Sequence, residues 1–178
     1  MPDETNLLGD KAYLTPPYQA PLPDSGRLRV GLAWAGNPHH KNDANRSIAW
    51  KQFATLTELD AVDFFSLQVG PRAADCAGSN VVSLEGQLND FAATAAVIEQ
   101  LDIVITVDTA VAHLAGALGK PTWVLLPAVP DWRWQLSRAD SPWYAQVKLY
   151  RRDTGDEGWP ETLDRVKQDL AKRTIAKN

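Results

Sequence analysis

The sequence is poor in the features that mark several classes of protein. It has one cysteine, Cys76. A lone thiol cannot form an internal disulfide, and no Cys or His stands at ligand spacing from it, so we expect an inert surface thiol. No apolar run approaches the roughly 20 residues that span a bilayer, and the polar N-terminus lacks the basic and apolar regions of a signal peptide. These absences predict a cytoplasmic protein without a membrane span.

Basic charge is also scarce. The chain has 18 Lys and Arg against 22 Asp and Glu, a net charge of -4, and the basic residues are scattered. A nucleic-acid-binding protein needs a basic stripe or arm, so we expect no nucleic-acid partner, whereas a small anionic ligand is compatible with this balance. No GxxxxGK[ST] loop is present, which leaves P-loop phosphoryl transfer unsupported.

The first 25 residues differ from the rest of the chain. They carry five prolines without apolar periodicity, namely Pro2, Pro16, Pro17, Pro21 and Pro23. Proline disfavours helices and interior strands. We therefore interpret residues 1–25 as a proline-rich linker or tail and residues 26–178 as one domain. Removal of residues 1–22 should change the melting temperature little, because such a segment buries little apolar surface.

From Arg27 onward, apolar runs alternate with segments of helical periodicity. The expected strands are 28–34, 63–68, 81–84, 103–107, 122–126 and 146–150, and the expected helices are 50–59, 89–101, 109–118 and 160–172. This alternation predicts an α/β fold with a doubly wound, parallel six-stranded sheet. The commonest order of such a sheet places the first and fourth strands side by side, where their connections diverge and ligands bind.

The predicted switch point brings two distant segments together. One is the loop 36–47, which is longer than the usual 2 to 6 residues of a strand-to-helix connection. Long loops are often functional, although its Asn and Asp residues equally suit a solvated loop of turns. Adjacent His39 and His40 with a nearby Asp raise the possibility of a metal, but neighbours in a loop rarely converge without a further ligand, so we expect no metal site.

The second segment is 104–127, VITVDTAVAHLAGALGKPTWVLLP. Its periodicity predicts strand, helix and strand, with unpaired N–H groups from Thr109 onward directed at the crevice, where anions are favoured. Asp108 suits either a helix N-cap or an acceptor for sugar hydroxyls. His113, one turn further on, suits either a structural role or a ligand contact.

Two other patterns are weaker. Gly31, Ala33 and Gly36 imitate a dinucleotide fingerprint but lie inside a strand, and Gln68 rather than an acid ends the second strand, which disfavours NAD. The aromatic residues Trp132, Trp134, Trp143 and Tyr144 could stack a base or pack an interface.

The motif DTAVAHLAGALGKPTWVLLP resembles the DTGxxHLAxALGxP motif of glycosyltransferase family 9, the bacterial heptosyltransferase-like enzymes. With RVGLAWAGNPHHKNDANRSI, FFSLQ, DWRW and SPWY, it is similar to the C-terminal domain of bacterial tetratricopeptide-repeat proteins that end in such a module. The resemblance implies the C-terminal half of a GT-B fold, a single Rossmann-like domain that holds a nucleotide-sugar donor. The acceptor site and the catalytic base would lie in an N-terminal domain, which leaves the catalytic residues of this chain unknown.

The same resemblance implies a set of donor-binding residues. They are Gly36, Asn37, Arg46, Gln68, Asp108, Thr109, Ala110, Val111 and His113. Asp108 would meet the sugar, the N–H groups of residues 109–111 would meet the diphosphate, and Arg46 would be the facing cation. Two positions depart from the family pattern, because Ala110 replaces a glycine and Gln68 stands where an acid for the ribose is expected.

Two functions follow as hypotheses. The first is the donor half of an inverting glycosyltransferase that uses a nucleotide sugar without a metal or other cofactor. Its partners would be an N-terminal acceptor domain or the tetratricopeptide repeats of a longer parent protein, and the isolated chain would not turn over. The alternative is a non-catalytic Rossmann-like module that binds proteins through its tryptophan surface. We expect Arg46→Ala to spare stability and Asp108→Ala to cost a helix cap.

Overall fold

The structure is a computed structural model that describes residues 11–153 and 158–177. Its centre is a six-stranded parallel sheet in the order β3-β2-β1-β4-β5-β6. The strands are β1 (Leu28–Ala33), β2 (Val62–Ser66), β3 (Val82–Ser83), β4 (Ile103–Val107), β5 (Thr122–Leu126) and β6 (Val147–Arg151). The predicted doubly wound α/β sheet, its strand order and its single-domain architecture are thus confirmed.

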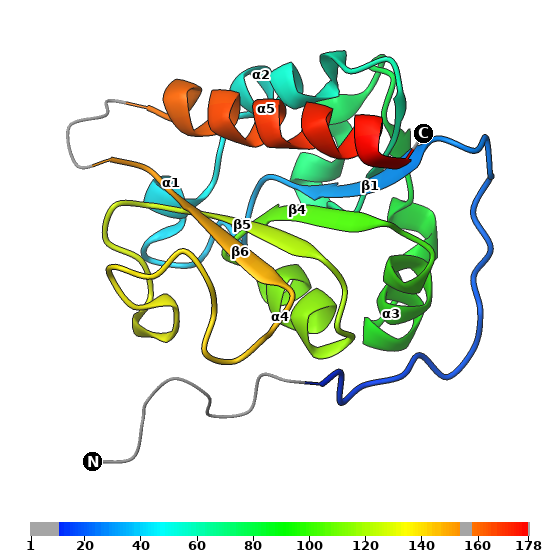
Figure 1. Ribbon diagram of the computed structural model, residues 1–178, viewed down its shortest axis with the longest axis horizontal. Helices are drawn as coiled ribbons and strands as arrows, with labels where there is room; N and C mark the ends of the chain where they lie inside the picture. Colours follow the sequence, from blue (N-terminus) through cyan, green and yellow to red (C-terminus); the bar gives the residue numbers. More distant parts are fainter. Residues whose placement is uncertain (1–10, 154–157, 178) are drawn as a thin grey trace.

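Helices cover both faces of this sheet, as Figure 1 shows. The helices are α1 (Asp43–Arg46), α2 (Trp50–Phe53), α3 (Phe91–Glu99), α4 (Ala110–Ala117) and α5 (Pro160–Lys177). One apolar layer joins the sheet to α2 and α5, and a second joins it to α3 and α4. Every residue of β4 and β5 is buried, which explains why these strands read as continuous apolar runs.

The helix expected over 50–59 is shorter than predicted. An α-helical turn, α2, passes at once into a 3₁₀ segment, Ala54–Glu58. The hydroxyls of Thr55 and Thr57 donate to the carbonyls of Gln52 and Ala54, three residues earlier. Such local bonds compete with the regular α-helical ladder and favour the tighter turn. A 3₁₀ segment over Gly70–Cys76, which periodicity did not predict, follows β2.

Two further expectations concerned Cys76 and the absence of a membrane span. Cys76 is buried, with its thiol 3.4 Å from the Ala73 carbonyl oxygen, so the expected surface thiol is wrong. No helix in the part of the chain described by the structure is both long and apolar enough to cross a membrane.

Residues 11–25, which we call the N-terminal strap, run along α3 and α4 to the start of β1 (Figure 1). The backbone N–H groups of Tyr13 and Leu14 both donate to the Ala117 carbonyl. Leu22 is buried in the apolar layer beneath α3 and α4, with Ala20 against it. This segment therefore packs more closely than its prolines indicated, because an extended chain can insert single apolar side chains without any periodicity. The linker interpretation of residues 1–10 lies outside the described residues.

The strap yields the first prediction. Leu22→Ala should lower the free energy of unfolding by about 2 kcal/mol, because it removes a buried side chain at the edge of the core. Leu14→Ala, in the same segment but exposed, should change it by less than about 0.5 kcal/mol. Urea denaturation of both variants checks this, and equal effects would show that Leu22 adds nothing to the core.

Candidate functional site

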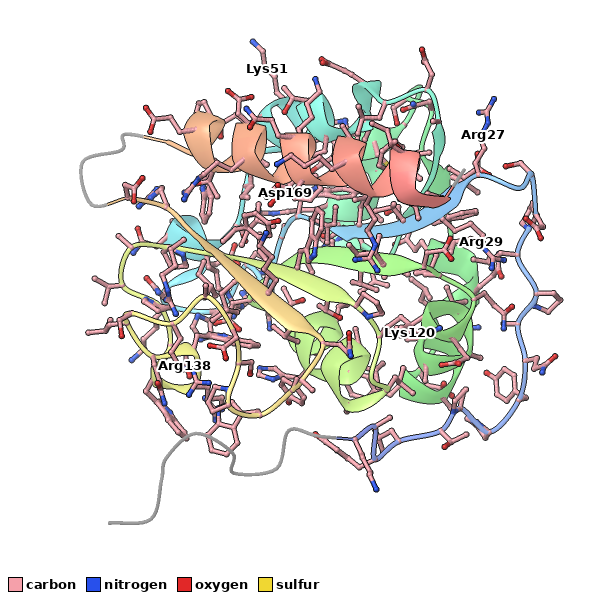
Figure 2. All side chains as sticks on the ribbon, in the orientation of Figure 1. Arg27, Arg29, Lys51, Lys120, Arg138 and Asp169 are labelled. Carbon is pink, nitrogen blue, oxygen red and sulfur yellow. The ribbon has the colours of Figure 1, made fainter. Side chains whose placement is uncertain are left out.

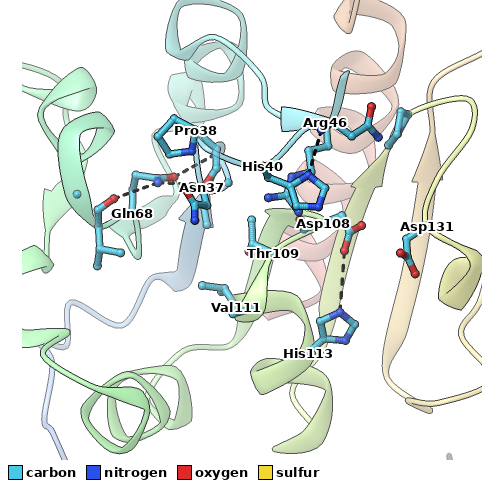
Figure 3. A pocket seen from close by; sticks show the side chains of 18 of the residues that line it. Asn37, Pro38, His40, Arg46, Gln68, Asp108, Thr109, Val111, His113 and Asp131 are labelled. Atoms are coloured by element: carbon cyan, nitrogen blue, oxygen red, sulfur yellow. Dashed lines mark hydrogen bonds and ion pairs between the residues drawn. The ribbon is translucent and has the colours of Figure 1, made fainter. Parts of the chain in front are cut away.

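An open cleft of about 970 Å³ lies at the carboxyl ends of the strands. One wall is the loop after β1, and the other is the junction of β4 and α4, as Figure 3 shows. The pairing of β1 with β4 makes this juxtaposition, since their connections leave toward opposite faces of the sheet. All nine predicted donor-binding residues line the cleft. Their contact with a ligand stays a prediction.

Arg46 ends α1 and crosses the cleft wall to the opposite segment. One guanidinium nitrogen donates to the Asp108 carbonyl at 3.0 Å, and the side chain is only 15% exposed. The guanidinium lies against Gly36, where an added Cβ would stand 2.5 Å from its terminal nitrogen. Glycine at position 36 is therefore what lets the arginine lie flat on the strand end. Arg46 therefore ties the two walls together, and the effect of Arg46→Ala on stability stays a prediction.

A buried carboxylate, Asp43, organises the base of the same loop. It accepts a hydrogen bond from Arg72 at 3.0 Å and lies 3.6 Å from the Nε of Arg46. Its other partner is the Ser47 hydroxyl at 2.7 Å, which in turn accepts from the Gly36 N–H at 2.9 Å. Asp43 thus holds two arginines and the loop backbone in one network. Its spacing three residues before Arg46 was the available sequence signal, whereas nothing in the sequence indicated Arg72.

Gln68 is buried, and its amide binds the end of β1. Its Oε1 accepts from the Ala35 N–H at 3.0 Å, and its Nε2 donates to the Ala35 and Val69 carbonyls at 3.1 and 3.4 Å. Both N–H donors of the amide are therefore engaged by the backbone. The side chain fixes the strand end that leads into the cleft, and this role explains an amide where an acid was expected.

The start of α4 differs from the sequence interpretation. Thr109, rather than Asp108, is the N-cap residue, and no side-chain cap bond is made. The first hydrogen bond runs from Ala112 N–H to the Thr109 carbonyl, so the N–H groups of Ala110 and Val111 precede the helical ladder. The Asp108 carboxylate points into the cleft, with Oδ1 3.9 Å from His113 Nε2 (Figure 3). The capping alternative for Asp108 is thus wrong.

His113 lies between the cleft and an aromatic cluster. Its ring stacks on the buried Trp134, with centroids 5.2 Å apart and planes 17° apart, and its Nδ1 lies 3.1 Å from the Tyr144 hydroxyl. Burial lowers the pKa of His113 below 6.5, against the carboxylate of Asp108, which raises it. The positive charge of Arg133 also lowers the pKa, and the carboxylate of Asp131 raises it. The imidazole is therefore neutral at pH 7. One ring nitrogen of His113 faces the aromatic cluster and the other faces the cleft. The structural role and the ligand contact that the sequence left open are therefore compatible.

The third side of the cleft follows β5, and its charged residues Asp131 and Arg133 were not among the predicted site residues. Asp131 accepts from the Arg133 guanidinium at 2.8 Å, and this guanidinium lies 4.8 Å from the centroid of the exposed Trp132 ring. Both charged residues line the cleft. Among the described residues, no group of three or more His, Cys, Asp or Glu side chains is arranged to hold a metal ion.

Residues 72–154 match the sequence model of glycosyltransferase family 9 (heptosyltransferase). The matched segment covers 83 of the 178 residues. It contains β4, α4 and the residues Asp108 to His113, whereas Arg46 and the loop around it precede it. The comparison with curated proteins found no match.

Solved structures of heptosyltransferases and of a family 9 glycosyltransferase share the fold. Escherichia coli ADP-heptose lps heptosyltransferase II has a TM-score of 0.60 at 17% identity, over 86% of this chain and 48% of that one. E. coli heptosyltransferase WaaC with ADP-2-deoxy-2-fluoro heptose gives 0.59 and 19%, over 84% and 44%. The family 9 glycosyltransferase from Veillonella parvula DSM 2008 gives 0.57 and 13%, over 88% and 48%. The chain therefore spans about half the length of these family 9 structures.

The Asp43 network gives the second prediction. Asp43→Ala should lower the free energy of unfolding by about 3 kcal/mol, because it leaves two arginines without their buried counter-charge. Asp60→Ala, at an exposed position, should stay within about 0.5 kcal/mol of the parent protein. Denaturant titrations of the two variants measure the difference, and a small effect at Asp43 would mean that solvent replaces it.

The third prediction rests on the lowered pKa of His113. Below about pH 6.5 the unfolded chain takes up a proton that the folded protein resists, so stability from this group is full above that pH and declines as the pH falls. Unfolding free energies at pH about 7.5 and about 5.5 should therefore differ more in the parent protein than in His113→Gln. Identical differences would show that His113 titrates alike in both states.

Proposed function

We propose that the cleft binds the diphosphate of a nucleotide sugar and that the chain acts as the donor half of a family 9 glycosyltransferase. The observation that carries this proposal is the convergence of Arg46, the start of α4 and the Asp108 carboxylate in one open cleft. The family match supports sugar-nucleotide transfer in general. Figure 3 shows how these groups face the same space.

The diphosphate would bind where positive charge is concentrated. The N–H groups of Ala110 and Val111 stand at the positive end of the α4 dipole, which favours anions. Ala110 is exposed, so its backbone is accessible even without the family's glycine. Arg46 contributes one bond to Asp108, and its remaining N–H donors supply a charge-assisted partner for a phosphate oxygen.

The sugar would lie beside Asp108. Within the described structure this carboxylate makes no hydrogen bond, and its approach to His113 Nε2 is 3.9 Å, so its oxygens are available to sugar hydroxyls. Two solved relatives were determined with ADP and with ADP-2-deoxy-2-fluoro heptose. Adenosine diphosphate is therefore the first probe for this cleft.

In this proposal, catalysis is metal-independent and inverting. Negative charge grows on the leaving diphosphate as the glycosidic bond breaks, and Arg46 with the start of α4 would stabilise it electrostatically. Acceptor and catalytic base would come from a second domain or from tetratricopeptide repeats, in line with the greater length of the family 9 structures. The two parts would orient the reactants across the cleft.

The direct test is a thermal-shift panel of nucleoside diphosphates and their sugars without divalent metals. A binder at a hundred times its Kd stabilises the folded state by about 2.7 kcal/mol, which is readily detected. Stabilisation by at least one diphosphate in metal-free buffer supports the proposal. Stabilisation that appears only after a divalent metal is added would contradict its metal-free form.

The fourth prediction concerns Arg46. Arg46→Ala should weaken diphosphate binding about ten- to a hundredfold, as expected for a lost charge-assisted hydrogen bond. Arg138→Ala is the matched control, since Arg138 is ion-paired with Asp140 in the loop before β6 and does not line the cleft (Figure 2). Calorimetric titration of folded protein at equal active concentration separates affinity from stability. Unchanged affinity in Arg46→Ala would remove this residue from the site.

The fifth concerns Asp108. Asp108→Asn should leave nucleoside-diphosphate affinity equal or higher, because it removes a negative charge near the phosphates. The same variant should lose about tenfold in affinity for the nucleotide sugar, which needs a carboxylate to accept from its hydroxyls. Titrating both ligands into both proteins gives the ratio directly. An equal loss for both ligands would place Asp108 in a general structural role.

The alternative, a non-catalytic interaction module, has one supporting observation. Val129, Leu136 and Trp132 are respectively 72%, 72% and 68% exposed near the third side of the cleft. Exposed apolar residues of this size are typical of interaction surfaces. A chain that binds no nucleotide in the thermal-shift panel would favour this alternative.

A further inference from the structure

Tyr144 lies flat against α4 because of a glycine. A Cβ added at Gly116 would stand 2.6 Å from Cγ and 2.8 Å from Cδ1 of the Tyr144 ring. These are rigid ring atoms, so any side chain at position 116 would move the ring away. Glycine weakens a helix interior, and its presence in the middle of α4 calls for a packing reason. Seating the Tyr144 ring supplies that reason.

The contact with Gly116 positions the Tyr144 ring and so determines which group the Tyr144 hydroxyl contacts. Residues 113 and 116 are three apart on α4 and therefore share one face of the helix. From Gly116 the ring extends back along this face, and its hydroxyl lies 3.1 Å from Nδ1 of His113. Trp134 closes the arrangement, since its ring stacks on His113 and lies 6.5 Å from that of Tyr144. The imidazole thus contacts both aromatic rings, with centroids 5.2 Å from Trp134 and 6.0 Å from Tyr144.

The other imidazole nitrogen decides which way this hydrogen bond runs. Nε2 of His113 faces the Asp108 carboxylate at 3.9 Å, a position that favours a proton on Nε2. Burial lowers the pKa of His113, so the ring carries one proton and Nδ1 is an acceptor. Burial also raises the pKa of the Tyr144 hydroxyl well above its usual range, so the phenol keeps its proton and can donate it to Nδ1.

We propose that Tyr144, seated on Gly116, is a positioning residue that holds His113 as a neutral Nε2–H donor facing the cleft beside Asp108. This rests on the proposed function, in which His113 Nε2–H donates to an oxygen of the anion bound at the start of α4. Tyr144 itself does not touch the ligand. Its hydroxyl donates to Nδ1, the imidazole nitrogen that faces away from the cleft, and this bond fixes the plane of the His113 ring.

The test uses the full chain labelled with ¹⁵N, inorganic pyrophosphate as the probe, and three variants. Tyr144→Phe removes only the hydroxyl. Tyr150→Phe is the matched control, because it removes a hydroxyl bonded to Asp169 of α5, on the other face of the sheet (Figure 2). His113→Gln assigns the His113 resonances among the three histidines of the chain.

In the parent protein, Nδ1 of His113 should resonate as an unprotonated nitrogen that accepts a hydrogen bond. In Tyr144→Phe this resonance should move toward the value of a free acceptor, and pyrophosphate affinity should fall roughly two- to tenfold, the effect of one neutral hydrogen bond. Tyr150→Phe should change neither.

Four results would overturn the proposal. A protonated Nδ1 in the parent protein would reverse the hydrogen bond, and an unmoved Nδ1 resonance in Tyr144→Phe would mean that the hydroxyl does not reach it. A moved resonance with unchanged pyrophosphate affinity would show that the orientation of His113 does not matter for binding. If the parent protein binds no pyrophosphate, the proposed function fails and the positioning role falls with it, while the resonances still report the bond.

Discussion

The pairing of β1 with β4 is the constraint from which the rest of the structure follows. These two parallel strands are neighbours, yet the chain leaves β1 toward α2 and leaves β4 toward α4, on opposite faces of the sheet. No connection can cover the gap between their carboxyl ends, so a cleft opens there. The two walls of the cleft are far apart in sequence, and Arg46 is the side chain that joins them directly.

The electrostatics of the cleft are local and do not follow the net charge of the chain. An acidic protein presents positive potential at one place because a helix start and a guanidinium meet there, and the buried Asp43 holds that guanidinium without occupying the cleft. Asp108 and Asp131 supply acceptors in the same cleft. Donors and acceptors side by side fit the proposed ligand, a nucleotide sugar, which carries both phosphates and hydroxyls.

The sequence predicted the large features because they rest on periodicity. Continuous apolar runs identified the strands, and the switch-point rule placed the loop 36–47 against Asp108. Features set by tertiary contacts were not accessible in this way. The burial of Asp43 depends on Arg72, the backbone role of Gln68 depends on where β1 ends, and the seat on Gly116 depends on a tyrosine that follows β5. Propensity also misplaced the cap of α4, because Asp108 turns toward the cleft.

The position of β1 in the sheet also has a consequence for biosynthesis. As the chain emerges from the ribosome, β1 can pair with β2 early, but its second edge has no partner until Ile103 and the rest of β4 have been made. During that interval an apolar strand edge is open to pairing with other chains. Sheets closed by such distant pairings fold slowly and are exposed to aggregation. The same strand order that opens the cleft therefore leaves one edge of β1 unpaired in the nascent chain until β4 has been made.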